Sequence, residues 1–496
     1  MPPIVLPKPK RPGKGGGGGG TGGGSWTDPD LQTSTLSAHY ATGSVFQGQG
    51  FTGAIPPDTN LSVGIDPNGN TQIVQVVNTS FAIYNTSGSQ LTVGGDLGLT
   101  LFSNLPSTAN CNANMDGGDP IVLWDQLDGR WLISQLAYNS DFSQNDFCLA
   151  ISDSADATGS YEVYDIPFGN SLPDYPKLGI WGDGIYFSAN MFNIKVNQFT
   201  GSVRSTFLGA QACSFSRPSW ITAPASITFT CSGTGNTAIY NILPADLDGA
   251  NIAPSGSDYY LQFVNNLSST SGNELALYQL QSGQLTALGN LSVGTFHDAC
   301  GGGTCIPQLG TTQQLDSLGD RLMYRLSYRN YGATQAMVVN HAVQVSSTST
   351  QTGIRWYQLC NQSATIPFSV CGQGTFSPDS TTYRWMGSIA QDGTGNLGLG
   401  YSTSSGSMYP SVAVTGMEKG VDSGMETEAV LYNGPNFQDT YSRWGDYSSV
   451  AVDPKDNCTF WYTTEYSTPT NVFGIYNFFW GTVIGSFNFP NCTPNP

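Results

Sequence analysis

The sequence has few charged residues and very few histidines. Only 10% of its 496 residues are charged, and histidine occurs three times, at His39, His297 and His341. None of the three lies near another and no CxxC spacing occurs, so we expect no metal site and no cofactor. A GxSxG nucleophile motif is also absent, so with only three scattered histidines a hydrolase with a Ser-His-Asp triad is not expected.

Long apolar runs and basic residues are scarce as well. No run approaches the roughly 18 residues of a membrane helix, so no membrane span is expected. Four of the 17 basic residues and none of the 35 acidic residues fall in residues 1–25, which leaves 13 basic against 35 acidic residues, or −22, in the rest of the chain. A body this acidic repels nucleic acid, so a nucleic-acid partner is not expected. Residues 1–30, rich in Pro, Lys and Gly, are predicted to be a disordered arm because they cannot pack a core.

Ten cysteines form successive near pairs along the chain. We predict five disulfides, which join Cys111 to Cys148, Cys213 to Cys231, Cys300 to Cys305, Cys360 to Cys371 and Cys458 to Cys492. An even cysteine count in a loop-rich, lysine-poor chain favours an extracellular or cell-surface protein. No charged-then-apolar leader precedes the arm in this numbering, so the expectation of secretion depends on the cysteines.

A strand–turn–strand plan repeats along the chain. Each copy has a polar or charged head, a short strand, usually a turn such as DPNGN or DPKDN, and a second strand. The copies begin at Asp58, Asp119, Asp174, Asp316, Tyr383 and Arg443, with a weaker one at Asp258. The long interval between Asp174 and Asp258 is attributed to an insertion that carries the Cys213–Cys231 pair.

Four short strands per repeat, with no helices, predict an all-β fold of the β-propeller type. About seven units indicate seven four-stranded blades in one domain spanning residues 35–496. A series of β-sandwiches is the alternative. The last unit is one strand short, and we predict that residues 35–48 supply its outer strand. The Asp66 and Asp453 turns are interpreted as hairpin turns, because neither has the terminal bidentate Glu of a calcium loop.

Propeller geometry would bring the charged heads together at one mouth of a central channel. Three kinds of residue are candidates for that mouth. The carboxylates that could act as catalytic groups are Asp58, Asp119, Asp316 and Asp446, the cations are Lys177, Arg325, Arg384 and Arg443, and the aromatics that could stack on a ligand are Tyr175, Trp385 and Trp444.

Three functions are compatible with such a mouth. The first is recognition of a polysaccharide or another polar extracellular polymer, since sugar hydroxyls bond charged groups and sugar faces stack on aromatic rings. The second is a glycoside hydrolase or lyase that uses the axial carboxylates, which requires two carboxyls about 5–5.5 or 6.5–9.5 Å apart. The third is a structural or adhesive protein whose opposite charges clamp neighbouring blades. A sialidase-like site, with Arg325, Arg384 and Arg443 on the substrate and Tyr324 or Tyr328 beside Glu465, is a further alternative.

Five blocks of the sequence carry a family resemblance. DGGDPIVLWDQLDGRWLISQ, DYPKLGIWGDGIYFSANMF, TCIPQLGTTQQLDSLGDRLMYRLSYRN, YRWMGSIAQD and SRWGDYSSVAVDPKDNCTFWYTTEY resemble an uncharacterised family of large secreted bacterial β-propeller proteins, distantly sialidase-like. The resemblance covers about residues 50–492. It implies an extracellular bacterial product and supplies no activity, so no catalytic residue is carried over. The sequence predicts a possible polysaccharide partner and does not predict an oligomeric state.

Overall fold

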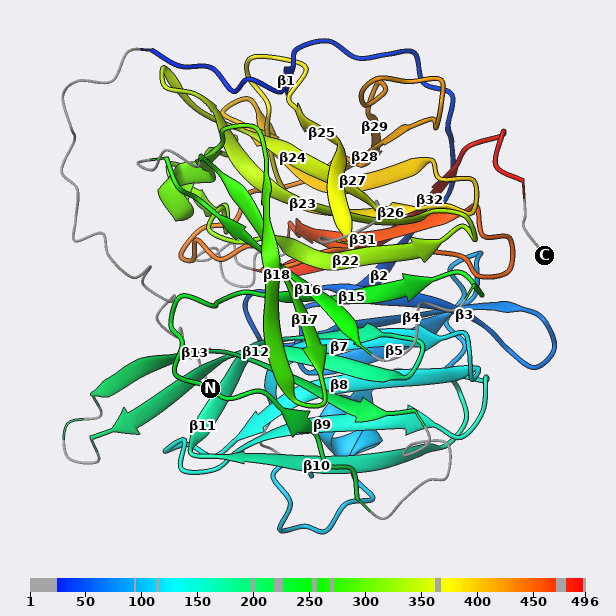
Figure 1. The fold of residues 1–496 in the computed structure, drawn as a ribbon, viewed down its shortest axis with the longest axis vertical. Coiled ribbons are helices and arrows are strands. Elements are labelled where there is room, and N and C mark those ends of the chain that lie inside the picture. The colour runs from blue at the N-terminus through cyan, green and yellow to red at the C-terminus, as the bar shows by residue number, and fades with distance from the viewer. Residues whose placement is uncertain are drawn as a thin grey trace.

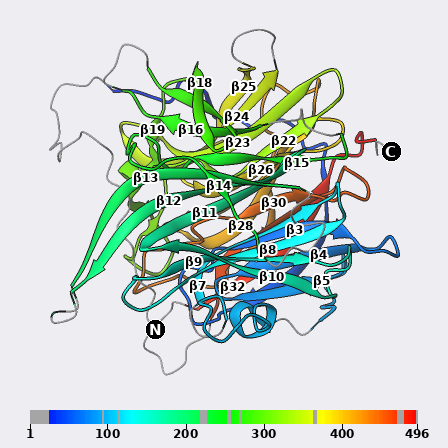
Figure 2. The ribbon, with the colours of Figure 1, turned by 60° about the horizontal axis from the view of Figure 1, so that its bottom comes forward.

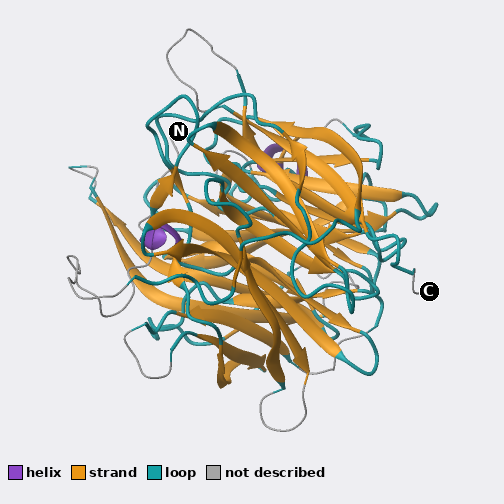
Figure 3. Ribbon diagram, turned by 90° about the horizontal axis from the view of Figure 1, so that it is seen from above, coloured by secondary structure: helices purple, strands orange, loops and turns teal. Residues whose placement is uncertain are grey.

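Strands make up nearly all of the regular structure in the computed structural model of the chain (Figure 3). The structure describes residues 25–92, 95–112, 116–197, 200, 202–217, 226–251, 257–267, 272–361, 367–469 and 479–493. Within these ranges the helical segments are η1 (Leu97–Leu101) and η2 (Ala299–Gly302). Neither of these short helices, nor any other helix in the described ranges, has the length and apolar character to cross a membrane.

Most strands form antiparallel runs of four (Figures 1 and 2). In chain order the first three runs are β3 (Asn60–Ile65), β4 (Thr71–Val77), β5 (Ser80–Tyr84) and β6 (Gly95–Asp96); β7 (Asp116–Asp125), β8 (Arg130–Tyr138), β9 (Asn145–Ser152) and β10 (Tyr161–Gly169); and β11 (Ser171–Ile180), β12 (Gly184–Val196), β13 (Val203–Ser216) and β14 (Thr230–Cys231). The next two are β15 (Leu243–Asp248), β16 (Asp258–Val264), β17 (Glu274–Gln281) and β18 (Gln284–Ser292); and β22 (Met323–Asn330), β23 (Gln335–Ser346), β24 (Ser349–Asn361) and β25 (Phe368–Phe376). The last two are β26 (Tyr383–Gln391), β27 (Leu397–Ser405), β28 (Met408–Met417) and β29 (Ala429–Tyr432); and β30 (Ser449–Val452), β31 (Phe460–Ser467), β32 (Trp480–Asn488) and β2 (Ala41–Gly50). The remaining strands are β1 (Leu31–Gln32), β19 (His297–Asp298), β20 (Thr304–Ile306) and β21 (Leu315–Asp316).

The first strands of these runs are arranged in a closed circle. Contacts connect β3 to β7, β7 to β11, β11 to β15, β15 to β22, β22 to β26, β26 to β30, and β30 back to β3. This arrangement confirms the all-β propeller expected from the sequence. The number of blades stays a prediction, because β15 and β22 pair in parallel and merge two of the runs into one larger sheet.

The core lies between neighbouring sheets. All seven residues of β4, all eight of β9 and all nine of β27 are buried. These inner strands are covered on both faces, so they are continuously buried, whereas outer strands such as β2, β10 and β18 keep exposed residues. The β12–β13 hairpin is an exception, because it extends beyond the body of the protein at the lower left of Figure 1.

An N-terminal strand closes the circle, as the sequence predicts. It is β2, which pairs antiparallel with β32 of the sheet that ends the chain. Its bounds, Ala41–Gly50, lie slightly later than the predicted range 35–48. The ends of the chain are therefore joined by a ladder of main-chain hydrogen bonds.

Part of the predicted arm lies on the body of the protein. The Trp26 ring stacks on the His297 ring with centroids 3.6 Å apart. Asp28 is buried and forms an ion pair with Arg355 at 2.5 Å. The predicted arm boundary at residue 30 therefore falls inside a docked segment, and residues 1–24 lie outside the described part of the chain.

All five predicted disulfides are present. The bonded pairs are Cys111–Cys148, Cys213–Cys231, Cys300–Cys305, Cys360–Cys371 and Cys458–Cys492. The Cys213–Cys231 pair lies in the β11–β14 sheet, where the two residues are direct partners on β13 and β14. The insertion proposed there is therefore wrong. The interval to Asp258 is long because Asp258 begins β16, the second strand of its run, and the first strand is β15.

The hairpin interpretation of the acidic turns is correct. β3 and β4 pair antiparallel up to Ile65 and Thr71. The Asp66 carboxylate accepts hydrogen bonds from the backbone N–H groups of Asn68 and Asn70, each at 2.8 Å. Asp66 thus stabilises the turn by a local side-chain-to-backbone bond.

Candidate functional site at the axis

A cluster of charged residues occupies the end of the circle where the first strands begin. We call it the axial cluster. Its members are Asp58, just before β3; Asp119 on β7; Asp174, Tyr175 and Lys177 on β11; Arg321, between β21 and β22; and Arg443, Asp446 and Tyr447, just before β30. The sequence prediction that distant charged heads converge is correct for Asp58, Asp119, Tyr175, Lys177, Arg443 and Asp446.

The same backbone turn places several of these residues. Asp58, Asp119, Tyr175 and Asp446 have positive φ angles of 52°, 54°, 57° and 55°. Positive φ is uncommon outside glycine, and such residues concentrate at functional sites. Because the turn recurs at the start of neighbouring first strands, it directs the three aspartates toward one another.

Asp58 and Asp119 form a carboxyl pair. Their side chains are hydrogen-bonded to each other, and the nearby Asp446 adds a third negative group. Asp58 is 2% exposed, and burial, followed by repulsion from Asp446 and Asp119, raises its pKa well above the usual value. Burial and the adjacent carboxylates therefore favour the protonated form of Asp58. Asp119 is half-buried, so the pair extends from the protein interior to solvent.

Each arginine of the cluster holds a neighbouring carboxylate. Arg443 makes a bidentate pair with Asp446, in which Nε donates to Oδ1 at 2.9 Å and Nη2 donates to Oδ2. Arg321 donates from Nε to Asp320 at 2.9 Å. Both cations also act on Asp174, but burial and repulsion from Asp119 outweigh them and raise the pKa of Asp174 to about 7. Asp174 therefore changes charge near neutral pH.

Lys177 lies beneath the carboxylates, between aromatic rings. Its Nζ is 3.6 Å from the Tyr175 ring centroid and 3.9 Å from the Tyr447 centroid, which is cation–π geometry. The same atom donates to the Pro176 carbonyl at 3.0 Å. Burial lowers the pKa of Lys177 to about 8, although Asp119 and Asp58 favour its charged form.

Hydrogen bonds fix the positions of these groups. The Asp119 N–H donates to Asn78 Oδ1, and the Tyr175 N–H donates to Asp119 Oδ2, both at 2.9 Å. The Tyr447 hydroxyl donates to the Pro120 carbonyl at 2.9 Å. These bonds join β7 to the turn after β4, to β11 and to the segment before β30, so the cluster is held by four parts of the chain.

The structure places Arg325 away from the predicted mouth. It lies on β22, where Nε contacts Asp246 at 2.8 Å, Nη2 contacts Asp248, and Nη1 donates to the Val450 carbonyl at 3.1 Å. These partners come from β15 and from β30. Arg325 is 4% exposed. It therefore links three first strands inside the circle and lies outside the axial cluster.

Arg384 also lies outside the axial cluster. Its Nη2 contacts Asp379 at 2.6 Å and Glu428 at 2.7 Å, and the side chain is fully buried. Arg325, Arg384 and Arg443 thus hold three different sets of carboxylates, which removes the sialidase-like arginine triad. Asp316 is buried as well, and its Oδ1 accepts from the Leu318 N–H at 3.0 Å.

The two predicted stacking tryptophans belong to the core. Trp385 and Trp444 have no exposed surface, and their ring centroids lie 5.9 Å apart. The Trp444 Nε1 donates to Ser402 Oγ at 3.1 Å. A ligand cannot reach either ring, so the stacking prediction is wrong. Large aromatic residues are more often used to fill space between sheets.

Sequence reasoning missed three members of the cluster. Asp174 is the first residue of a predicted repeat, so the repeat alone could have identified it. Tyr447 directly follows Asp446, one of the predicted carboxylates. Arg321 lies in the head of the copy that begins at Asp316, in the loop between β21 and β22, so the repeat could have identified it as well.

Comparisons with known proteins add no family. No family model matches the sequence, and no curated protein sequence matches it. Among solved structures, a fungal alcohol oxidase of the AA5 family in complex with copper has 10% identity and a TM-score of 0.44, covering 92% of this chain and 79% of its own. The α-L-arabinofuranosidase Arb93A of Fusarium graminearum has 9% identity and a TM-score of 0.35 over 95% and 99% of the two chains. Drosophila Semaphorin 1a, extracellular domains 1–2, has 8% identity and a TM-score of 0.37 over 84% and 86%. TM-scores below 0.5 support no inference about function, and a bacterial source and a sialidase relationship stay predictions.

Proposed function

We propose that the protein is a secreted, carbohydrate-active β-propeller that cleaves a glycosidic bond at the axial cluster by acid–base catalysis. The observation that carries the proposal is the contact between the carboxyls of Asp58 and Asp119 beside the ion-paired Asp446, where burial raises the pKa of Asp58. A general acid must keep its proton at the working pH, and burial of a carboxyl next to other carboxyls has that effect.

In this proposal the carboxyls have separate roles. Asp58 and Asp119 are hydrogen-bonded, which is closer than the separation of the two catalytic carboxyls in either retaining or inverting hydrolases. The pair therefore acts as one unit, in which buried Asp58 supplies the proton and half-buried Asp119 faces the substrate. Asp446, aligned by Arg443, is the second carboxyl group.

The substrate class follows from charge. The formal net charge of −18 disfavours approach of an anionic polymer. A neutral polysaccharide avoids this repulsion and offers hydroxyls to Asp119, Asp174 and Arg443, the more exposed members of the cluster. Secretion is supported by the five disulfides.

Recognition of the same polysaccharide without cleavage is the second candidate. The observation that favours it is the burial of Asp58 and Lys177, which are 2% and 1% exposed. In that case the buried groups would hold Asp119 and Asp174 in place for hydrogen bonding and would transfer no proton.

Incubation with a panel of neutral and uronate-containing polysaccharides distinguishes the candidates. Binding and released reducing ends are measured for the wild type, Asp119→Asn and Asp446→Asn, with Asp141→Asn in an exposed loop as the control. Cleavage predicts release from a neutral polymer that falls at least 100-fold in both cluster variants and is unchanged in the control. Binding without release would exclude the enzyme and leave recognition, and the absence of both would overturn the proposal.

A further inference from the structure

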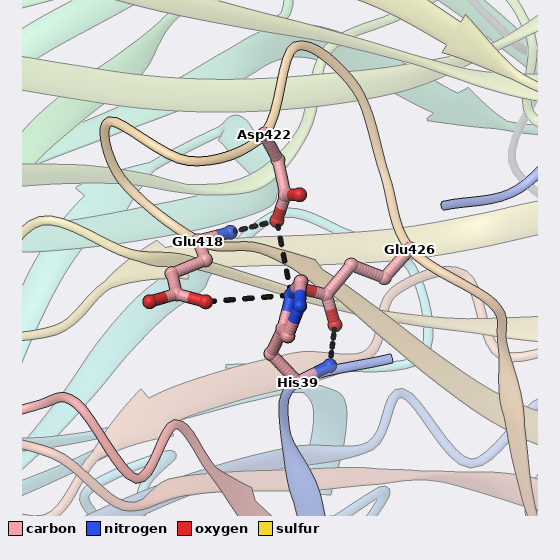
Figure 4. Close-up of side chains that lie close together, drawn as sticks. All are labelled: His39, Glu418, Asp422 and Glu426. Atoms are coloured by element: carbon pink, nitrogen blue, oxygen red, sulfur yellow. Dashed lines mark hydrogen bonds and ion pairs between the residues drawn. The ribbon is translucent and has the colours of Figure 1, made fainter. Parts of the chain in front are cut away.

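A second group of polar side chains lies far from the axial cluster in the sequence. His39 precedes β2, and Glu418, Asp422 and Glu426 belong to the segment between β28 and β29 (Figure 4). One ligand atom from each of the four side chains lies within 4.8 Å of every other. Figure 4 shows the three carboxylates converging on the imidazole ring.

The distances are those of a metal-binding set. His39 Nδ1 lies 2.9 Å from Glu426 Oε1, 3.3 Å from Glu418 Oε2 and 4.0 Å from Asp422 Oδ2. Ligands about 2.0–2.2 Å from a shared metal ion lie at most about 4.4 Å from one another. Small side-chain adjustments therefore suffice for all four groups to bind one ion.

The charge of the group is not balanced by protein cations. Three carboxylates meet one imidazole, so even a protonated His39 leaves a net charge of −2. No lysine or arginine in the described part of the chain forms an ion pair with Glu418, Asp422 or Glu426, whose only such partner is His39. The Glu426 side chain is fully buried and that of Asp422 is 4% exposed, so water screens this charge poorly.

The mixed set of ligands distinguishes this group from an acidic surface patch. An imidazole nitrogen suits Zn²⁺ and similar transition-metal ions, whereas Ca²⁺ is bound by oxygen ligands. The His39 side chain is 44% exposed, which gives an ion access and leaves room for water to complete the coordination.

We propose that His39, Glu418, Asp422 and Glu426 bind one divalent transition-metal ion of the Zn²⁺ or Mn²⁺ type. The proposal departs from the sequence-based expectation of no metal, which considered only histidines and cysteines close to one another in the sequence. His39 meets its partners from about 380 residues away, so spacing along the chain gives no signal.

The ion would reinforce closure of the circle. Residues 32–40 run beside 425–427, where the Thr427 N–H donates to the Leu36 carbonyl at 2.8 Å and the Tyr40 hydroxyl donates to the Thr427 carbonyl at 2.6 Å. The chain then enters β2, which completes the sheet containing β30–β32. A metal at His39 therefore fastens the N-terminal segment to the β26–β29 sheet immediately before it closes the ring.

Metal binding is tested on the full-length protein after treatment with a chelator and gel filtration. Zn²⁺, Mn²⁺, Co²⁺ and Ca²⁺ are added separately, and bound metal, the thermal unfolding midpoint and the visible spectrum of bound Co²⁺ are recorded. His39→Ala and Glu418→Gln alter the two most exposed ligands and should leave the fold intact, and Asp141→Asn is the control.

We expect one transition-metal ion per chain, a higher unfolding midpoint with that ion, and a Co²⁺ spectrum that indicates nitrogen ligation. His39→Ala and Glu418→Gln should each lower the affinity at least tenfold, and the control should leave it unchanged. Failure of Zn²⁺, Mn²⁺ and Co²⁺ to bind, or equal affinity in His39→Ala, would overturn the proposal. Preference for Ca²⁺ would also overturn it, because an all-oxygen site would not need His39.

Discussion

The carboxyl groups of Asp58 and Asp119 are hydrogen-bonded to each other across two neighbouring first strands, although 61 positions separate them in the sequence. Both residues have left-handed backbone conformations at corresponding turns. The repeat thus places like charges in contact, and a shared proton together with Arg443 makes that contact tolerable. The same arrangement raises the pKa of Asp58 and so favours its protonated form.

The first prediction concerns the pH dependence of stability at Asp174. Its pKa rises to about 7 in the folded protein and is about 4 in an unfolded chain. The folded state therefore holds a proton that the unfolded state releases, and the free energy of unfolding falls as pH rises from about 4 to about 7. Asp174→Asn removes this loss. At pH 7 the free energy of unfolding of the variant should therefore exceed that of the wild type by about 1–4 kcal/mol, and the lower end is expected because solvent reaches this carboxyl.

Urea unfolding of Asp174→Asn at several pH values measures the effect. The advantage of the variant should be close to zero at pH 4 and constant above pH 7. Asp141→Asn is the control with the opposite sign, because hydrogen bonds from Ser143 lower the pKa of Asp141. A difference between Asp174→Asn and wild type that does not change with pH would show that Asp174 titrates normally.

The second prediction concerns the ion pairs inside the ring. Arg325→Ala leaves Asp246 and Asp248 without their cation in a buried site, and we expect a loss of about 3–5 kcal/mol in the free energy of unfolding. Adding Asp248→Asn to this variant should restore part of the loss. Arg204→Ala, at an exposed position on β13, should change stability by less than about 0.5 kcal/mol. Equal effects at Arg325 and Arg204 would show that the pairs do not hold the strands together.

The third prediction concerns the last disulfide. Cys458 and Cys492 are 34 positions apart, and closing a loop of that length stabilises the folded state by about 4 kcal/mol in the chain-entropy treatment. The double variant Cys458→Ser/Cys492→Ser should unfold at correspondingly lower denaturant concentration. Reduction of the wild type also opens the other four bridges. It should therefore destabilise the protein at least as much as the double substitution does.

The fourth prediction concerns ring closure by β2. Deletion of residues 1–50 exposes the edge of β32, a nine-residue buried strand, and should yield an aggregating or much less stable protein. Deletion of residues 1–24 alone should leave the unfolding midpoint within about one degree of wild type. Both deletions are compared by gel filtration and thermal unfolding. A stable, monodisperse product of the longer deletion would contradict the role assigned to β2.

Repetition made most of the fold predictable. The heads at Asp58, Asp119 and Arg443 recur with their hairpins, and this periodicity was sufficient to infer a propeller and the need for a closing strand. The weak copy at Asp258 was misplaced by one strand, because a run of alternating residues looks the same for the first and the second strand of a sheet.

The candidate site was predictable only where it follows the repeat. Asp58, Asp119 and Asp446 share one turn and converge, whereas Arg325 lies seven positions beyond Leu318, the positive-φ residue before its strand, and pairs with Asp246 and Asp248 within the ring. Trp385 was misassigned because an aromatic residue beside a charged head can face the axis or the space between sheets, and only packing decides which. His39 meets Glu426 through ring closure, which local sequence does not reveal.

The proton on Asp58 is the central claim, and infrared difference spectroscopy at pH 7 tests it most directly. The spectrum of Asp58→Asn is subtracted from that of the wild type in the region of the carbonyl stretch of protonated carboxyl groups. We expect a band that belongs to one protonated carboxyl, is lost in Asp58→Asn, and shifts in Asp119→Asn because its hydrogen-bond partner has changed. A flat difference spectrum in this region would mean that Asp58 is ionised, and would contradict both the carboxyl pair and the acid–base chemistry proposed for it.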